Sequence, residues 1–212
     1  MRLRHDPAAA PFVAAHAQVL LEDAAPAHRG AWRQALGLDA AAALALEIGC
    51  GRGRFILEAA QARPECGFLG LELRAEMVMQ AIERVSELPP NLRFLCLNAA
   101  LLPELFAAGE VDTVYLNFPD PWPKSRHAKR RLTAPPFLRQ YREILSSDGR
   151  LRFKTDNRPL FDWTLENLPA SGLAVVEIDY ALDAAVSGPI SEYEARFRRR
   201  GQPIYYLSAG RA

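Results

Sequence analysis

Short apolar runs alternate along this chain with longer stretches in which apolar residues recur at helical spacing. Each run is rich in Leu, Ile, Val or Phe, which is typical of strands buried on both faces of a sheet. The stretches between them have one apolar face, which predicts surface helices. The pattern therefore predicts an α/β fold with a mostly parallel, seven-stranded sheet covered by helices on both faces. The predicted strands lie at about residues 44–48, 66–73, 92–97, 111–118, 150–155, 173–178 and 204–208.

The first forty residues have a different character, because they are rich in Ala, Pro and His. We expect an irregular amino-terminal extension over residues 1–40, followed by a single domain over residues 41–212. Trp32 is interpreted as a core residue, although the basic groups around it could instead lie beside a functional site. One short helix is predicted from a stripe of apolar residues at Phe12, Val13, Ala17, Leu20 and Leu21.

Three glycines alternate directly after the first apolar run, at Gly49, Gly51 and Gly53, and Glu47 precedes them. Glycine allows a ligand to approach the main chain where the next helix presents unpaired N–H groups. The spacing differs from the dinucleotide fingerprint G-x-G-x-x-G. A carboxylate at the strand end favours a ligand with an ammonium or sulfonium charge over one with phosphates. The segment predicts a small-molecule site; a purely structural turn is the alternative.

Polar side chains also follow the next predicted strands. Glu72 lies about 20 residues past the glycines, the offset at which doubly wound folds place an acid on a ribose diol. Asn98 can donate and accept, as the reading of an adenine edge requires, but it could equally be a turn residue. Asp120 and Asp156 follow two further strands. Because the carboxyl ends of parallel strands share one edge of the sheet, these side chains should gather around one pocket.

Residues 117–124 read Asn-Phe-Pro-Asp-Pro-Trp-Pro-Lys, and residues 125–131 continue as Ser-Arg-His-Ala-Lys-Arg-Arg. Three prolines restrict the backbone just past a strand and hold a carboxylate, an indole and an ammonium group on it. A rigid loop beside a basic run is suited to binding a polyanion while it presents one base. Trp122 could stack on a base or pack against its own loop.

The composition and net charge of the chain exclude several kinds of protein but do not identify a function. The net charge of the 212 residues is +1, so a nucleic acid would have to be bound by a local concentration of Lys and Arg. Three cysteines without close pairing fit neither a disulfide framework nor a zinc knuckle, and we expect no metal. No apolar run is long enough to span a bilayer, so no membrane association is expected. A reducing, cytoplasmic location is the simplest expectation.

Four segments together resemble the tRNA (guanine-N7-)-methyltransferase family of the bacterial single-subunit type, from about residue 46 to residue 207. Besides the glycine segment, they are residues 117–124, Phe-Lys-Thr-Asp-Asn at 153–157, and Ser-Glu-Tyr-Glu at 191–194 with Gly-Gln-Pro-Ile-Tyr at 201–205. The proline-rich segment is the most specific of these. The family usually has Thr where this chain has Ser191, and the hydroxyl is kept.

The resemblance implies a Rossmann-like class I methyltransferase fold and methyl transfer from S-adenosylmethionine to N7 of guanosine 46, in the variable loop of tRNA. It implies a monomer or homodimer with no obligatory protein partner. The cofactor site would include Glu47, Gly49, Gly51, Gly53, Glu72, Asn98 and Asp120, with Asp120 also catalytic. Substrate would be bound by Lys124, Asp156, Ser191, Glu192, Tyr193 and Glu194. RNA would contact Arg126, His127, Ala128, Lys129, Arg130 and Arg131.

Some alternatives stay open at this point. Either Asp156 or Glu194 could accept from the N–H edge of guanine. The run of Arg196, Arg198, Arg199 and Arg200 is either a second phosphate-binding patch or a solvated helix face. Three other functions compete. A nicotinamide-dependent oxidoreductase would need the dinucleotide glycine spacing, which this chain lacks, and a small-molecule methyltransferase would leave the basic run unexplained. A catalytically dead RNA-binding scaffold should have lost its cofactor-site acids or glycines, which this chain keeps.

Overall fold

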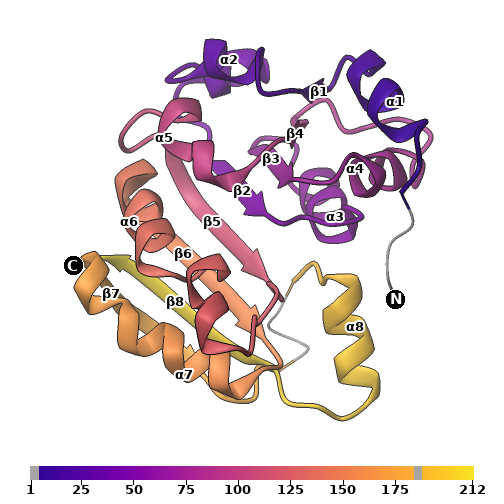
Figure 1. Ribbon diagram of the computed structural model, residues 1–212. Helices are drawn as coiled ribbons and strands as arrows, with labels where there is room; N and C mark the ends of the chain where they lie inside the picture. The colour runs from indigo at the N-terminus through magenta and orange to yellow at the C-terminus, as the bar shows by residue number, and fades with distance from the viewer. Residues whose placement is uncertain (1–4, 184–187) are drawn as a thin grey trace.

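The computed structural model describes residues 5–183 and 188–212 (Figure 1). Its centre is an eight-stranded sheet with the order β1-β4-β3-β2-β5-β6-β8-β7. Within the described residues, neighbouring strands are parallel except where β8 pairs with β6 and with β7. The strands are β1 (Val19–Leu20), β2 (Leu44–Ile48), β3 (Gly67–Glu72), β4 (Leu92–Cys96), β5 (Val111–Asn117), β6 (Leu145–Thr155), β7 (Leu173–Asp179) and β8 (Tyr205–Arg211).

The connections between strands are mostly helical. The α-helices are α1 (Ala9–Ala15), α2 (Trp32–Ala35), α3 (Arg54–Ala62), α4 (Ala75–Ile82), α5 (Leu102–Leu105), α6 (Pro135–Ile144), α7 (Arg158–Asn167) and α8 (Glu192–Arg199). Short 3-10 helices are η1 (Ala25–His28), η2 (Ala99–Leu101), η3 (Ser125–Arg130) and η4 (Pro169–Ser171). In the described part of the chain, no helix combines the length and apolarity needed to cross a membrane.

The predicted α/β fold with a mostly parallel sheet is confirmed, but the sheet has eight strands rather than seven. The additional strand is β1, whose residues Val19 and Leu20 pair with Phe94 and Leu95 of β4. The predicted helical stripe from Phe12 to Leu21 is therefore wrong beyond α1. Hydrogen bonds to a distant strand override the local helical spacing there, which is a non-local effect that a short window of sequence does not contain.

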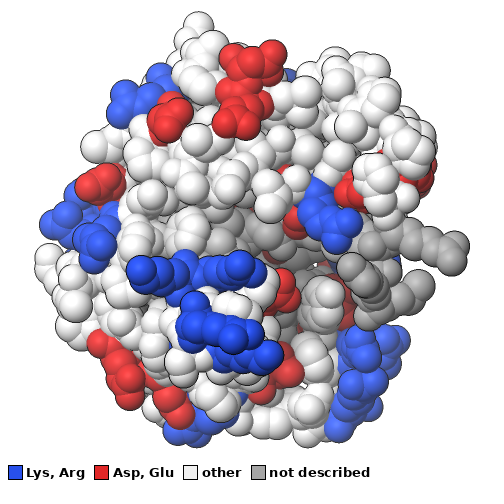
Figure 2. Space-filling model, viewed as in Figure 1, with Lys and Arg blue, Asp and Glu red and all other residues white. Residues whose placement is uncertain are grey.

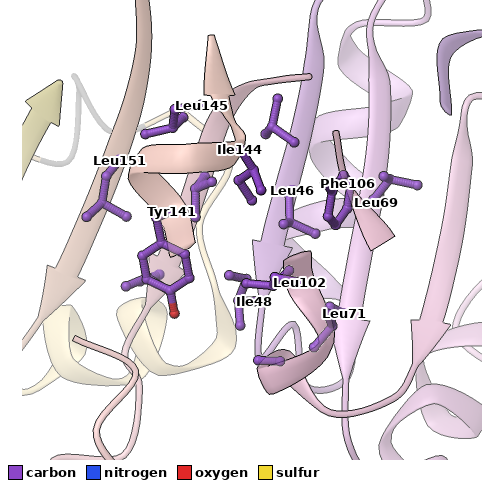
Figure 3. Packing of buried hydrophobic residues seen from close by; sticks show 14 of the residues in the cluster. Leu46, Ile48, Leu69, Leu71, Leu102, Phe106, Tyr141, Ile144, Leu145 and Leu151 are labelled. Atoms are coloured by element: carbon purple, nitrogen blue, oxygen red, sulfur yellow. The ribbon is translucent and has the colours of Figure 1, made fainter. Parts of the chain in front are cut away.

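Apolar side chains pack on both faces of the sheet, as expected for parallel strands. On one face, Leu46 of β2 and Leu69 of β3 contact Phe106, just past α5, while Tyr141 of α6 covers the neighbouring strands (Figure 3). The opposite face is covered by α3 and α4, with Ile56 and other apolar residues in a second cluster. Every residue of β2 is buried, so the first predicted strand lies at the centre of the fold.

The amino-terminal segment contributes to this core. The Trp32 side chain is fully buried, and its indole Nε1 donates to the carbonyl oxygen of Leu105 at 2.8 Å. The carboxylate of Glu110 accepts from the backbone N–H of Gly30 and of Trp32, at 2.9 and 3.1 Å. The segment before residue 41 is thus packed against α5 and the start of β5, while the domain boundary itself stays a prediction.

We expect Trp32→Ala to lower the free energy of unfolding by about 3–5 kcal/mol, because it removes a buried aromatic side chain and leaves a cavity. Urea unfolding followed by circular dichroism measures this change. Phe12→Ala is the control, since Phe12 is 38% exposed. A loss below about 1 kcal/mol for Trp32→Ala would show that the amino-terminal segment does not contribute to the stability of the domain.

Candidate functional site

The strand order reverses between β2 and β5, because β3 and β4 extend from one side of β2 while β5 and β6 extend from the other. Ligands of doubly wound sheets bind at such a reversal, beyond the carboxyl ends of the strands. Two polar side chains meet there: Asn117 Nδ2 of β5 donates to Glu47 Oε1 of β2 at 2.9 Å. The other carboxyl oxygen of Glu47 is buried and has no hydrogen-bond partner among the described residues. One oxygen of this buried carboxyl group is thus left for a partner from outside the chain.

Burial also controls the protonation of Glu47. Desolvation raises the pKa of its carboxyl group to about 8; the hydrogen bond from Asn117 opposes this shift, and the nearby charge of Glu72 adds to it. The free site therefore holds Glu47 mostly protonated at neutral pH. A cationic ligand that reaches the unpartnered oxygen would favour the ionised form, so ligand binding and proton release are coupled here.

The glycine loop is held against the end of β3. The backbone N–H groups of Gly49 and Cys50 donate to the carbonyl oxygen of Leu71, and Gly51 N–H donates to Glu72 Oε2 at 3.1 Å. Desolvation raises the pKa of Glu72, while backbone N–H groups of Arg74 and Gly51 oppose the shift. The structure thus brings Glu72 to the loop, although one of its oxygens is already used by the loop itself.

Gly53 is required by both conformation and space. It has a φ of +73° and caps the start of α3. A Cβ atom at this position would lie 2.8 Å from the Cβ of Ala81 in α4. The third glycine therefore allows α3 to pack closely against α4, which is a structural role beside its predicted cofactor role.

Asn98 lies two residues past the end of β4, close to where the sequence placed it, and it is exposed. Its Oδ1 accepts from the backbone N–H of Ala100 at 2.9 Å and caps η2. This is the turn role that the sequence left open. The amide group of the same side chain can still donate, so its predicted contact with the cofactor stays compatible with this geometry.

The loop at residues 118–124 is strained. Phe118 and Trp122 have φ values of +54° and +42°, which bulky residues rarely adopt. Such conformations cost on the order of 1–3 kcal/mol each and persist where the surrounding structure fixes them. Phe118 N–H donates to Lys154 O of β6, and Phe118 stacks on Phe197 of α8 with ring centroids 5.6 Å apart. The loop that carries Asp120 is therefore fixed at its start.

Arg131 fixes the far end of the same loop. Its Nε donates to the carbonyl oxygen of Pro121 at 3.1 Å and its Nη2 to that of Trp122 at 3.2 Å. Its guanidinium group also lies 4.4 Å from the centroid of the Trp163 ring. The sequence predicted that Arg131 contacts RNA, and this stays a prediction. The sequence did not predict that Arg131 also packs against its own loop.

Two basic side chains of η3 pack against Trp122. The Arg130 guanidinium lies 5.0 Å from the centroid of the indole, and the His127 ring meets the indole edge-on at 5.6 Å. Trp122 thus packs within its own loop, which favours the packing alternative over base stacking. Arg126 and Lys129 are exposed. Figure 2 shows Lys and Arg side chains gathered over η3 and again over α8, with a hollow and acidic side chains between them.

The carboxylate of Glu194 is buried in an ion pair. It is 1% exposed, and Lys154 Nζ donates to its Oε2 at 3.0 Å, while Arg198 donates to its Oε1 at 2.7 Å. Burial lowers the pKa of Lys154, and Glu194 opposes this shift. Because both carboxylate oxygens are engaged in a buried ion pair, Glu194 is poorly available to guanine. Asp156, half-buried directly after β6, is better placed.

The other predicted substrate residues lie around α8 and the strand ends. Ser191 caps α8, with its hydroxyl accepting from Glu194 N–H at 3.1 Å. Glu192 forms ion pairs with two arginines, and Tyr193 is 51% exposed. Asp120 and Lys124 are both exposed on the strained loop.

A cavity of about 350 Å³ is lined by Phe55 of α3 and by Asn117, the hydrogen-bond partner of Glu47. Asn117, Lys154 and Tyr206 lie in its wall, with Gly188 and Pro189 at the segment before α8. Glu47, the glycine loop, Glu72, Asn98 and Asp120 are not among the residues that line it. The structure thus joins Glu72 to the glycine loop, which directly follows Glu47 and β2. Asp120 and Asp156 lie beyond the ends of the neighbouring strands β5 and β6. The sequence did not predict the buried contacts of Asn117 with Glu47 and of Lys154 with Glu194. Both residues lie in mostly apolar strands, which gave no signal of buried polar partners.

Comparison with known proteins gives one consistent family. Residues 41–207 match a family described as putative methyltransferase. Curated relatives named tRNA (guanine-N(7)-)-methyltransferase include those of Bacillus licheniformis, 38% identical over 99% of this chain and 98% of the relative, and of Exiguobacterium sp., 42% identical over 99% and 97%. The relative from Bacillus subtilis is 38% identical over 97% of this chain and 96% of its own length.

Solved structures with the same fold are more distant. The 16S rRNA methyltransferase KamB has a TM-score of 0.64 at 16% identity, covering 84% of this chain and 92% of its own. A 16S rRNA (adenine(1408)-N(1))-methyltransferase from Catenulisporales acidiphilia, solved with cosubstrate SAM, has a TM-score of 0.61 at 18% identity, covering 88% and 91%. These similarities concern the fold.

Replacing Glu47 by Gln should stabilise the protein increasingly as pH rises from about 5 to 8. Folded Glu47 keeps its proton up to about pH 8, whereas in the unfolded chain the proton leaves near the usual value of 4.5. The folded state therefore binds more protons in this window, and wild-type stability falls by up to about 1.4 kcal/mol per pH unit. Thermal melts of both proteins across this range measure the difference.

Glu166→Gln is the matched control, because Glu166 is exposed on α7. A difference between Glu47→Gln and the wild type that stayed constant from pH 5 to 8 would contradict the raised pKa.

Proposed function

The chain belongs to the tRNA (guanine-N7-)-methyltransferase family, and from that premise we propose that it transfers a methyl group from S-adenosylmethionine to N7 of guanosine 46 in tRNA. The observation that carries most weight is the unpartnered, buried oxygen of Glu47 beside a glycine loop at the reversal of the strand order. The bound cofactor supplies an electrophilic methyl group on a sulfonium centre.

The residues present fit such a cofactor. The free oxygen of Glu47 can accept from its ammonium group, which is the cationic donor that a buried carboxylate requires. The left-handed glycines Gly49 and Gly51 keep side chains away from the loop surface where the ligand would lie. Glu72 can accept from the ribose hydroxyls with its remaining lone pairs, and the Asn98 amide can donate to the adenine.

Guanine N7 has a lone pair and no proton, so the acceptor needs orientation rather than deprotonation. Positioning an acceptor in line with its partner at about 3 Å can supply roughly 7–11 kcal/mol of the barrier. The strained loop, fixed by Phe118 at one end and Arg131 at the other, provides a rigid support for this. The guanine becomes cationic as the bond forms, and the Asp120 carboxylate would stabilise that developing charge.

Asp156 is proposed to accept from the N–H edge of the same guanine. Its rival Glu194 has both oxygens in bonds to Lys154 and Arg198. Lys124, Arg126 and Lys129 would bind phosphates near the site, because they are exposed on the loop and on η3. A small-molecule methyltransferase would not need this surface. We expect the enzyme to act in the cytoplasm without an obligatory protein partner.

The direct test is to incubate the purified protein with S-adenosylmethionine and unmodified tRNA and to map methylated nucleosides by mass spectrometry. We expect 7-methylguanosine at position 46. Asp120→Asn should lower the single-turnover rate by about 10²–10³-fold, the range seen when one transition-state contact is removed. Asp148→Asn is the control, because Asp148 is exposed in β6. Near-normal turnover by Asp120→Asn would refute the catalytic role of Asp120.

Lys129→Ala should weaken tRNA binding and make the slope of log affinity against log salt shallower by about 0.9, because one phosphate contact is lost. Filter binding at several salt concentrations measures this slope. Arg139→Ala, exposed on α6, is the control that removes the same charge elsewhere. Equal slopes for Lys129→Ala and the wild type would place the RNA outside the η3 surface.

A further inference from the structure

Helix α8 contacts β6, the strained loop and the glycine loop. Its inner face joins β6 through the Lys154–Glu194 ion pair and joins the strained loop through the stack of Phe197 on Phe118. Its first residue, Glu192, reaches in the opposite direction, toward the glycine loop. In Figure 1, α8 stands beyond the ends of β5 and β6 and next to α3, apart from the helices that cover the sheet. A helix with these contacts connects the cofactor half of the site to the acceptor half.

The contact with the cofactor half is ionic. Arg84, two residues past the end of α4, forms an ion pair with Glu192 Oε1, and Arg52 Nη1 lies 3.8 Å from Glu192 Oε2. Arg52 stands between the second and third glycines of the loop, so any force on its side chain acts on the main chain that would hold the ligand. One carboxylate thus connects α8 to two cofactor-side elements.

The arginine cluster beside Glu192 is partly buried. Burial lowers the pKa of Arg84, the guanidinium groups of Arg52 and Arg54 lower it further, and the carboxylate of Glu58 opposes the shift. Arg52 Nε is buried without a hydrogen-bond partner among the described residues. Like charges so close repel one another unless an anion lies between them. Glu58 pairs with Arg54, whereas Glu192, from a different element, pairs with Arg84 and lies close to Arg52.

We propose that Glu192 is a positioning residue that couples the cofactor-binding glycine loop to the tRNA-binding loop at residues 118–124 through α8. The inference rests on the proposed function, because it assigns these two loops to the two substrates. The resemblance had placed Glu192 in direct contact with substrate. Its carboxylate is directed to Arg84 and Arg52 instead, so Glu192 acts on both substrates by holding the helix between them.

A charge-swap cycle tests the coupling, with Glu192→Arg, Arg84→Glu and the double variant. Each single variant places like charges together, so we expect S-adenosylmethionine to bind about fivefold more weakly, by calorimetry, and the single-turnover rate on saturating tRNA to fall by a similar factor. The double variant reverses the pair at positions 84 and 192 but leaves Arg52 beside a cation, so it should recover part of both losses and its effect should be smaller than the product of the two single effects. Thermal melts should show the single variants to be folded.

Glu143→Arg is the charge-matched control, because Glu143 is exposed at the end of α6 and the substitution changes the net charge by the same amount. It should leave cofactor affinity and the transfer rate unchanged. Two results would overturn the inference: effects of the single variants that simply multiply in the double variant, or a cofactor affinity that Glu192→Arg does not alter. Recovery of cofactor binding by the swap in a protein that does not methylate tRNA would support the inference and refute only the proposed function.

Discussion

A buried carboxyl group at the reversal of the strand order is the constraint around which the site is built. Glu47 lies at the centre of the sheet, where desolvation raises its pKa to about 8 and Asn117 satisfies one oxygen. The other oxygen has no partner in the described structure. Burying a carboxyl oxygen without a partner reduces the stability of the free protein, and a ligand that hydrogen-bonds to this oxygen removes that cost. The fold therefore keeps in its core a group that its own packing does not satisfy.

The acceptor side is built by a second kind of constraint, which is backbone strain. Phe118 and Trp122 hold positive φ angles, and contacts from β6, α8 and Arg131 maintain them. Rigidity of this kind suits a transfer in which no proton must first be removed and alignment supplies most of the rate. The cofactor side of the site thus depends on electrostatics, whereas the acceptor side depends on a preorganised backbone geometry.

The fold class could be predicted from the sequence because a parallel sheet leaves a strong local signature. Apolar runs such as residues 44–48 are buried on both faces and cannot be mistaken for amphipathic helices. The glycine loop and the acid before it could be found for a similar reason, since strand, turn and helix follow within a few residues. β1 could not be found, because two residues carry no pattern and its pairing with β4 is a contact between distant parts of the chain.

By itself, the sequence determined which residues stand at the strand ends and therefore which chemistry reaches the open edge of the sheet. Only the tertiary structure decided how those side chains are used. It directed Glu194 into a buried pair with Lys154, Arg131 to the carbonyl groups of its own loop and Glu192 to arginines more than a hundred residues away. A charged side chain finds its partner through space, and the partner's identity depends on packing that no local spacing along the chain encodes.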